Sequence, residues 1–216
     1  MKIAWIHCWL FNGGALEVFK DLLLKKIRDN ADSEYQIFTL IADTPLKTFE
    51  LFCPWSEETV QISVVEALPK RMSSLFIYFS HHQIPIFSSL FNYRNLIVFY
   101  PFLMKILSRK LKRFAPDEVL ISSFAIAKNI TLPNTCHHSF LYLHSPMQYI
   151  RSHYQEYFSK FSGRKQKLFE IITPRLRKRD QKYTSFDEVV FNSHYTEHLA
   201  QELNPTSWGF MICRGW

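Results

Sequence analysis

Glycine is scarce in this chain and cysteine motifs are absent. Five glycines in 216 residues exclude collagen-like and glycine-rich low-complexity sequences. The four cysteines are far apart and form no C-x-x-C pair: Cys8, Cys53, Cys136 and Cys213. This spacing argues against a disulfide scaffold and a cysteine zinc site, and it fits a reducing cytoplasm. No Cys/His finger and no aromatic RNA-binding motif is present, so we expect no nucleic-acid partner.

Features of export and of membrane insertion are also lacking. Met1-Lys2 leads directly into Ile3-Ala4-Trp5-Ile6, without a long apolar region or a small-residue cleavage site. The longest uncharged stretch, Met72 to Tyr93, has His81-His82-Gln83 and Pro85 in its middle. These residues are unfavourable at the centre of a bilayer. We therefore expect a soluble, cytoplasmic protein.

The chain is rich in apolar residues and has two clusters of basic residues. It is 47% hydrophobic, which is enough for a sizeable core and excludes global disorder. The net charge of +7 is concentrated in residues 105–113 and 164–182. Such clusters attract phosphate on a nucleotide or on lipid head groups, and they predict a peripheral contact with the inner face of the cytoplasmic membrane. A solvated helix face is the alternative explanation.

Strand and helix patterns alternate along the sequence. Short apolar runs predict strands at residues 2–9, 35–42, 59–65, 117–123, 140–143 and 188–191. Helical spacing predicts helices from Ala15, over most of 72–114, and at 124–130, 147–158, 164–182 and 194–203, the last capped by Ser193. This alternation predicts one α/β domain with a Rossmann-like parallel sheet flanked by helices, and a helical insertion between its third and fourth strands.

Two segments that directly follow predicted strands are candidates for binding. Gly13 and Gly14 stand between the first strand and a helix, where glycine lets a phosphate or sugar approach the backbone and the helix end offers N–H groups. The segment is not the G-x-G-x-x-G fingerprint, and a simple tight turn is equally compatible. His144 and Ser145 follow the fifth strand, so His144 can hydrogen-bond a sugar hydroxyl or stabilise developing charge. Ordering of the loop is the alternative role for this histidine.

The sequence contains one motif that is typical of a zinc site. Residues 194–198 match H-x-x-E-H, the signature of a class of zinc peptidases. Such enzymes need a third ligand from a downstream segment, and only 18 residues follow His198. We expect neither a metal nor a cofactor.

Several segments, taken in order, resemble one enzyme family. They are residues 1–7 with Trp9-Leu10 and Gly13-Gly14-Ala15, then Phe114 to Asp117, Ser122 to Lys128, Leu143 to Tyr149, and Asp187 to Ser193. Over residues 1–203 the chain resembles the N-terminal, acceptor-side domain of bacterial GT-B glycosyltransferases of the retaining family-4 type. Their openings read close to "MKIAIVHDWL…GGAE", and "DRFIANS" precedes their last helix in this domain.

The resemblance implies transfer of a hexose from a nucleotide sugar to a glycan or lipid-linked acceptor, with retention at the anomeric carbon. It places Gly13 and Gly14 near the donor diphosphate and His144 in the active cleft as the catalytic residue. Ser145, Arg151 and Ser193 are candidates for lining that cleft. The alternative, from a different class, is a non-catalytic module that binds phosphate-bearing ligands or an anionic membrane.

The sequence departs from the family in two respects. Leu16 stands where the family carries glutamate, and Glu17 follows one position later. Residues 204–216 lack family character, and the second Rossmann domain, which holds the nucleotide-sugar pocket and the E-x7-E carboxylates in the family, does not follow. A truncated or frame-shifted product is one explanation for this ending. We expect the chain to be inactive alone, unless a separate polypeptide supplies a donor domain in trans.

Overall fold

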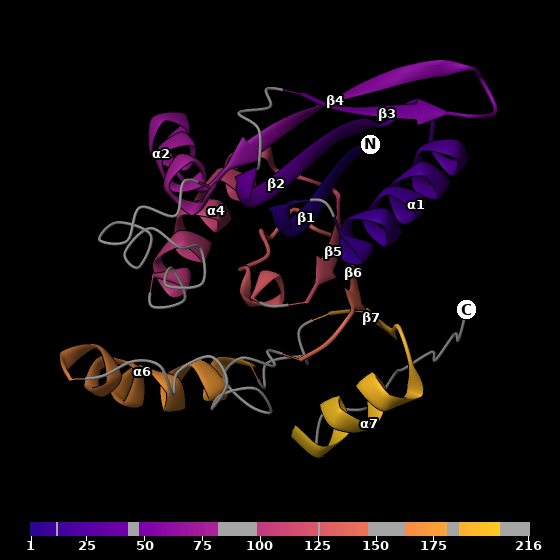
Figure 1. Cartoon of the computed structure of the whole chain (residues 1–216). Helices are drawn as coiled ribbons and strands as arrows, with labels where there is room; N and C mark the ends of the chain where they lie inside the picture. The colour runs from indigo at the N-terminus through magenta and orange to yellow at the C-terminus, as the bar shows by residue number, and fades with distance from the viewer. Residues whose placement is uncertain are drawn as a thin grey trace.

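A computed structural model shows a seven-stranded sheet with helices on both faces (Figure 1). It describes residues 1–11, 13–42, 48–81, 99–124, 126–146, 163–180 and 186–203. The strands are β1 (Lys2–Leu10), β2 (Glu34–Ala42), β3 (Thr48–Cys53), β4 (Glu58–Glu66), β5 (Glu118–Ser123), β6 (His138–Leu143) and β7 (Glu188–Phe191). The helices are α1 (Gly14–Asp29), α2 (Lys70–His81), α4 (Tyr100–Phe114), the 3-10 turn η2 (Ala127–Asn129), α6 (Arg164–Asp180) and α7 (His194–Leu203).

The order of the strands is that of a Rossmann fold. Across the sheet they run β3-β4-β2-β1-β5-β6-β7, and every neighbouring pair except β3–β4 is parallel. The six parallel strands, numbered along the chain, therefore lie in the order 3-2-1-4-5-6 that defines the doubly wound dinucleotide-binding fold. The order reverses at β1, which pairs with β2 on one side and β5 on the other. The predicted α/β class and Rossmann-like sheet are confirmed.

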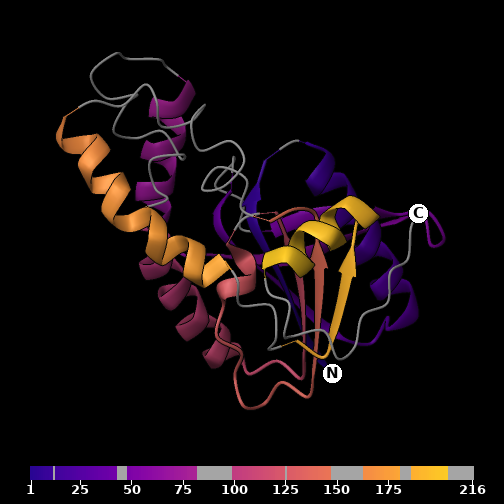
Figure 2. The ribbon, with the colours of Figure 1, turned by 90° about the horizontal axis from the view of Figure 1, so that it is seen from below.

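Alternate side chains of β1 enter two separate cores because successive residues of a strand point to opposite faces. Ile3 and Trp5 pack with Phe19 and Leu23 of α1 on one face. Ala4 and Ile6 pack on the other face with α4, whose Leu107 is almost completely buried. Figure 2 shows α1 on one side of the sheet and the α2–α4 pair on the other. β1 is thus covered on both faces, which explains its nearly unbroken apolar sequence.

The antiparallel strand β3 was not predicted from the sequence. It pairs with β4 from Thr48 opposite Ser63 to Cys53 opposite Glu58, so the sheet is not purely parallel. The chain reverses at Glu57, whose φ of 56° lies in the left-handed region. Phe49, Leu51 and Cys53 are buried while Glu50 and Phe52 are exposed. This alternation over six residues is the signal that could have revealed the strand.

The helix predicted for residues 124–130 is wrong in extent. Among the described residues of this segment, only the three-residue turn η2 is helical. Backbone N–H groups of the turn bond to side chains of neighbouring strands. Ala127 N–H donates to Cys8 Sγ (3.1 Å), and Lys128 N–H donates to Ser123 Oγ (3.4 Å). Side-chain acceptors of this kind compete with the helical carbonyls for the same donors.

Within the described residues, the other predicted elements agree with the structure to within a few residues, and positions 82–98 of the predicted helical region lie outside them. The helical insertion is α2 and α4, between the third and fourth parallel strands, and α4 begins at Tyr100 so that Pro101 occupies its tolerant first turn. Ser193 caps α7 as predicted, accepting the Thr196 N–H at 3.2 Å. The helix predicted at 147–158 lies outside the described residues. Among the helices that are described, none is long and apolar enough to span a bilayer.

Candidate functional site

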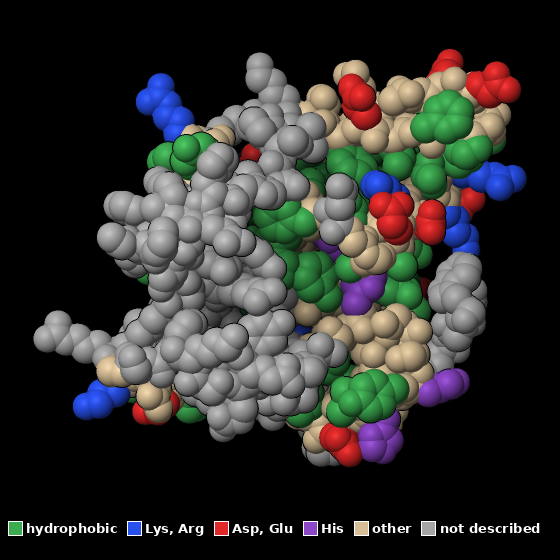
Figure 3. Space-filling view, in the orientation of Figure 1, with side chains coloured by type: hydrophobic (Ala, Val, Ile, Leu, Met, Phe, Trp, Pro, Cys, Tyr) green, Lys and Arg blue, Asp and Glu red, His purple; other side chains and the backbone are tan. Residues whose placement is uncertain are grey.

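Three polar side chains meet where the strand order reverses. His7 near the end of β1 is paired in register with Ser122 of β5, and His144 directly follows β6. All three lie at the carboxyl edge of the parallel strands, where open α/β sheets bind ligands at the switch point. Figure 3 shows histidine side chains in the middle of the face seen in Figure 1, bordered by hydrophobic ones.

The Ser122 hydroxyl joins the two imidazoles. Ser122 Oγ lies 3.0 Å from His7 Nδ1 and 2.8 Å from His144 Nε2. The two rings are 6.5 Å apart between centroids, and Phe124 lies beside both, 5.4 Å from His7 and 6.4 Å from His144. His7, Ser122 and His144 therefore form a continuous hydrogen-bonded row, the polar row, which runs from inside the sheet to its edge.

Both imidazoles are neutral at neutral pH. Burial lowers the pKa of His7 to about 3, assisted by Coulomb repulsion from His144. Burial likewise lowers the pKa of His144 to about 4. Desolvation disfavours the charged form of a base, and no carboxylate of the described residues contributes to either shift. A neutral histidine here can donate or accept a hydrogen bond without carrying charge.

Ser122 is not placed as a nucleophile. Its side chain is buried, with 1% of the residue exposed, and its oxygen is occupied by two ring nitrogens. A serine that attacks a substrate must have an accessible oxygen beside its base. His144 is half-buried, so it is the member of the row that reaches the surface.

Gly13 and Gly14 lie at the start of α1, beyond the end of β1. Both are exposed, and a Cβ added to either would meet no atom of the described residues within 4 Å. Gly13 has extended backbone, with φ 161° and ψ 167°, which other residues also adopt. Packing and backbone conformation therefore do not account for glycine at these positions. Open space at both is compatible with close approach of a ligand.

Ser193 is connected to His144 through Thr196 of α7. Ser193 Oγ donates to Thr196 Oγ1 (3.1 Å), and Thr196 Oγ1 donates to the His144 carbonyl (3.3 Å). The cap of α7 thus holds the backbone of the histidine loop. Ser145 is half-buried next to His144, and Arg151 lies outside the described residues.

The polar row continues across the other half of the sheet. Thr39 of β2 is level with His7, and Glu66 of β4 is level with Thr39. Glu66 is 5% exposed, and its two carboxylate oxygens are buried with no hydrogen-bond partner among the residues that the structure describes. At this level, five neighbouring strands therefore each carry a polar side chain or a tyrosine, the last being Tyr142 of β6, opposite Ser122.

Sequence reasoning found His144 but missed His7 and Ser122 as site residues. The signal for His7 is a histidine inside a largely apolar strand that is covered by helices on both faces. The signal for Ser122 is the change from apolar to hydroxyl residues at the end of β5. Neither signal identifies the contact, because the two residues are 115 positions apart and meet only through strand pairing.

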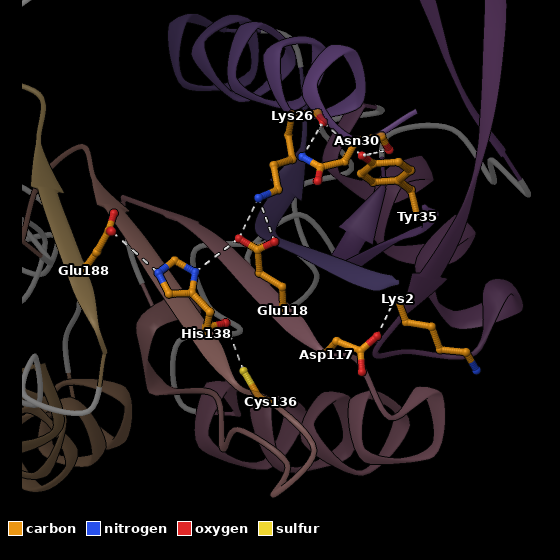
Figure 4. Close-up of polar contacts among 9 residues, drawn as sticks. All are labelled: Lys2, Lys26, Asn30, Tyr35, Asp117, Glu118, Cys136, His138 and Glu188. Carbon is orange, nitrogen blue, oxygen red and sulfur yellow. Dashed lines mark hydrogen bonds and ion pairs between the residues drawn. The ribbon is translucent and has the colours of Figure 1, made fainter. Parts of the chain in front are cut away.

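A second titratable cluster lies at the opposite, amino edge of the sheet (Figure 4). Glu118 accepts from Lys26 Nζ (2.8 Å) and lies 3.2 Å from His138 Nδ1, and His138 Nε2 is 3.6 Å from Glu188. These contacts join α1, β5, β6 and β7. Ligands of this fold bind at the carboxyl edge, so we assign the cluster a structural role.

The H-x-x-E-H segment lies on the exposed surface of α7. The His194 and His198 side chains are 85% and 71% exposed, and each lies near a carboxylate of its own helix, Glu197 or Glu202. Among the residues the structure describes, no group of three or more metal-ligating side chains comes together. The sequence pattern is therefore a helix surface rather than an assembled zinc site in this part of the chain.

Comparison of the chain with protein-family models, curated proteins and solved structures found no match. The fold and the geometry of its carboxyl edge therefore define the class of the protein, a Rossmann-like α/β domain with a histidine-centred candidate site.

Proposed function

We propose that the chain is one wall of a glycosyltransferase cleft, which transfers a hexose from a nucleotide sugar to a glycan or lipid-linked acceptor with retention. The proposal joins the resemblance of residues 1–203 to retaining GT-B enzymes with the position of the polar row. The observation that carries it is the neutral, half-buried His144, aligned by Ser122 at the switch point.

Each part of the site has a distinct role in this proposal. Gly13 and Gly14 leave space for a diphosphate at the N-terminus of α1, where the helix dipole favours negative charge. His144 forms a hydrogen bond to a phosphate or sugar oxygen of the bound donor, and negative charge on that oxygen increases in the transition state. Such a bond is stronger in the partly apolar setting of Phe124 than in water.

Binding of sugar nucleotides tests the role of His144. We expect UDP-glucose, GDP-mannose or ADP-glucose to bind weakly to the purified chain in calorimetric titrations. His144→Gln should weaken binding of the best probe about tenfold, since a hydrogen bond to a charged group is lost. His138→Gln is the matched control, because His138 is also half-buried but lies at the amino edge.

Two results would contradict the proposal. One is that no probe binds at millimolar concentration. The other is that the His144 and His138 variants bind the probes equally well.

A second candidate function, binding to an anionic membrane, is favoured by the surface of α4. Phe99 and Phe102 are 58% and 61% exposed, and Lys105, Arg109 and Lys112 continue the same exposed stripe toward the C-terminal end of the helix. Their spacing of three or four residues places them on one helix face. An apolar end beside a basic stripe fits an interfacial helix on anionic lipid, where each basic residue contributes about 1 kcal/mol.

Vesicle sedimentation tests this second candidate. The chain should pellet with vesicles of phosphatidylcholine and phosphatidylglycerol at low salt, and less so at high salt. Arg109→Gln should reduce binding more than Arg28→Gln, which removes an exposed charge from α1. Equal binding to anionic and neutral vesicles would exclude recognition of an anionic membrane through these basic residues.

A further inference from the structure

The Ser122 hydroxyl has one proton to share between two neutral rings. Its oxygen is within hydrogen-bond distance of both His7 Nδ1 and His144 Nε2. The hydroxyl can donate to only one nitrogen, so the other ring must donate to its oxygen. The tautomers of the two histidines are therefore coupled, and only two arrangements satisfy both contacts.

In the first arrangement, His7 Nδ1–H donates to Ser122, and Ser122 donates to His144 Nε2. A neutral imidazole has one N–H, so His144 then carries its proton on Nδ1. In the second arrangement, His144 Nε2–H donates to Ser122, and Ser122 donates to His7 Nδ1. His7 then carries its proton on Nε2, and His144 Nδ1 is a bare acceptor.

Burial distinguishes the two arrangements. The second leaves an N–H on the far side of His7, which is 1% exposed and lies beside the Phe19 and Phe124 rings, 4.9 and 5.4 Å away. Within the described residues, Ser122 is the only side chain that hydrogen-bonds to the His7 ring. A buried N–H without an acceptor is rare and costly. The first arrangement instead leaves its remaining N–H on half-buried His144, where water or a ligand can accept it.

We propose that His7 and Ser122 are positioning residues that hold His144 as its Nδ1–H tautomer, so that His144 offers a hydrogen-bond donor at the carboxyl edge of the sheet. The ligand group that fits this donor is an oxygen acceptor, such as a phosphate or sugar oxygen. His144 is then a donor to developing negative charge and not a general base. This assignment deepens the proposed function, but its test requires no sugar nucleotide.

Nitrogen NMR of the ligand-free chain tests the assignment directly. In a histidine-15N-labelled sample at pH 7.5, two-bond nitrogen–proton correlations distinguish the Nδ1–H from the Nε2–H tautomer, and His144→Gln identifies the His144 signals. We expect His144 to be the Nδ1–H form. Ser122→Ala should shift the tautomer ratio of His144 at least about fivefold toward Nε2–H, the form that free histidine prefers in water, because the orienting bond is lost.

Three further variants separate positioning from a general loss of structure. Ser122→Thr keeps the hydroxyl and should retain the wild-type tautomer. Ser123→Ala removes an equally buried hydroxyl from the neighbouring position of β5 and should leave His144 unchanged. His7→Phe removes the donor to Ser122 and should also enrich the Nε2–H form.

Two outcomes would overturn the assignment. One is that wild-type His144 is the Nε2–H tautomer, a result that holds even if a variant fails to fold. The other is that folded Ser122→Ala and wild-type chain give the same tautomer. Because no ligand is present, either result is independent of whether sugar nucleotides bind.

Discussion

His7 and His144 are two bases kept in surroundings that disfavour their protonation. Each is neutral in the folded chain down to low pH, with pKa values of about 3 and about 4, whereas histidine in an unfolded chain has a pKa of about 6.5. Between those values the unfolded state binds more protons than the folded state. The contribution of the two histidines to stability is therefore complete above pH 6.5 and is lost as the pH falls toward 4.

We expect the free energy of unfolding to fall by about 1.4 kcal/mol per pH unit for each of these histidines below pH 6.5. Urea titrations between pH 7.5 and 4 measure it. His7→Phe should flatten this dependence by about one histidine's share, whereas His194→Gln, at an exposed position of α7, should not. If the unfolding free energies of wild type and His7→Phe had the same pH dependence, folding would not lower the pKa of His7.

At the scale of elements, the glycines before α1 and before α6 differ in backbone conformation. Gly13 has extended backbone and open space around it, whereas Gly163, which precedes α6, has a φ of +62°. Only the second conformation is costly for a residue with a Cβ.

Alanine substitutions should therefore separate folding from binding. Gly13→Ala should change the unfolding free energy by less than about 0.5 kcal/mol, while Gly163→Ala should lower it by about 1 kcal/mol. If a diphosphate approaches the loop, Gly13→Ala should weaken the best sugar-nucleotide probe and Gly163→Ala should not. Destabilisation by Gly13→Ala equal to that of Gly163→Ala would contradict this distinction.

Helix α6 is tied to the carboxyl edge of the sheet by a buried ion pair. Lys128 Nζ of η2 lies 2.5 Å from the carboxylate of Asp180, the last residue of α6, and neither side chain is exposed. Buried charges of this kind stabilise little relative to apolar residues, but removal of one partner is expensive.

We expect Asp180→Ala to lower the unfolding free energy by about 3–5 kcal/mol, and the double variant Lys128→Met/Asp180→Leu to recover most of the loss. Glu17→Gln provides the comparison, because Glu17 pairs with Lys20 on the surface of α1 and should contribute less than about 1 kcal/mol. Chemical denaturation of the four proteins checks both values. No difference between the Asp180 and Glu17 variants would contradict a buried role for the Lys128–Asp180 pair.

At the scale of the whole molecule, the described residues form one sheet and one carboxyl edge. In the proposed function this edge supplies one wall of a cleft, and the resemblance assigns the nucleotide pocket to a second Rossmann domain. Transfer requires donor, acceptor and active-site groups to be held together, because positioning supplies much of the rate.

We therefore expect the 216-residue chain by itself to show no turnover of UDP-glucose, GDP-mannose or ADP-glucose with glycan or polyprenyl-phosphate acceptors. Release of nucleoside diphosphate, followed by chromatography, measures it. If the proposed function is right, transfer should require addition of a polypeptide that carries a donor domain of the kind the resemblance implies. Robust transfer by the chain alone that is lost in His144→Ala would contradict the one-wall assignment.

The sequence by itself determined the α/β class and most of the elements. Runs such as Lys2 to Trp9 and the spacing of Leu16, Phe19 and Leu23 are local patterns, and local patterns are sufficient to predict a strand or an amphipathic helix. The sequence also placed Gly13, Gly14 and His144 after strands, and hence at one edge of a parallel sheet. It missed β3, whose alternation is short, and overextended the helix that became η2.

Only the tertiary structure decided what surrounds His144. Ser122 is 22 residues from His144 and 115 from His7, and strand pairing alone brings the three together. Burial then makes both histidines neutral, and the difference in burial between His7 and His144 decides which arrangement of protons is favoured. Local sequence specifies where a strand ends, but the chemistry at that end depends on neighbours that the sheet order supplies.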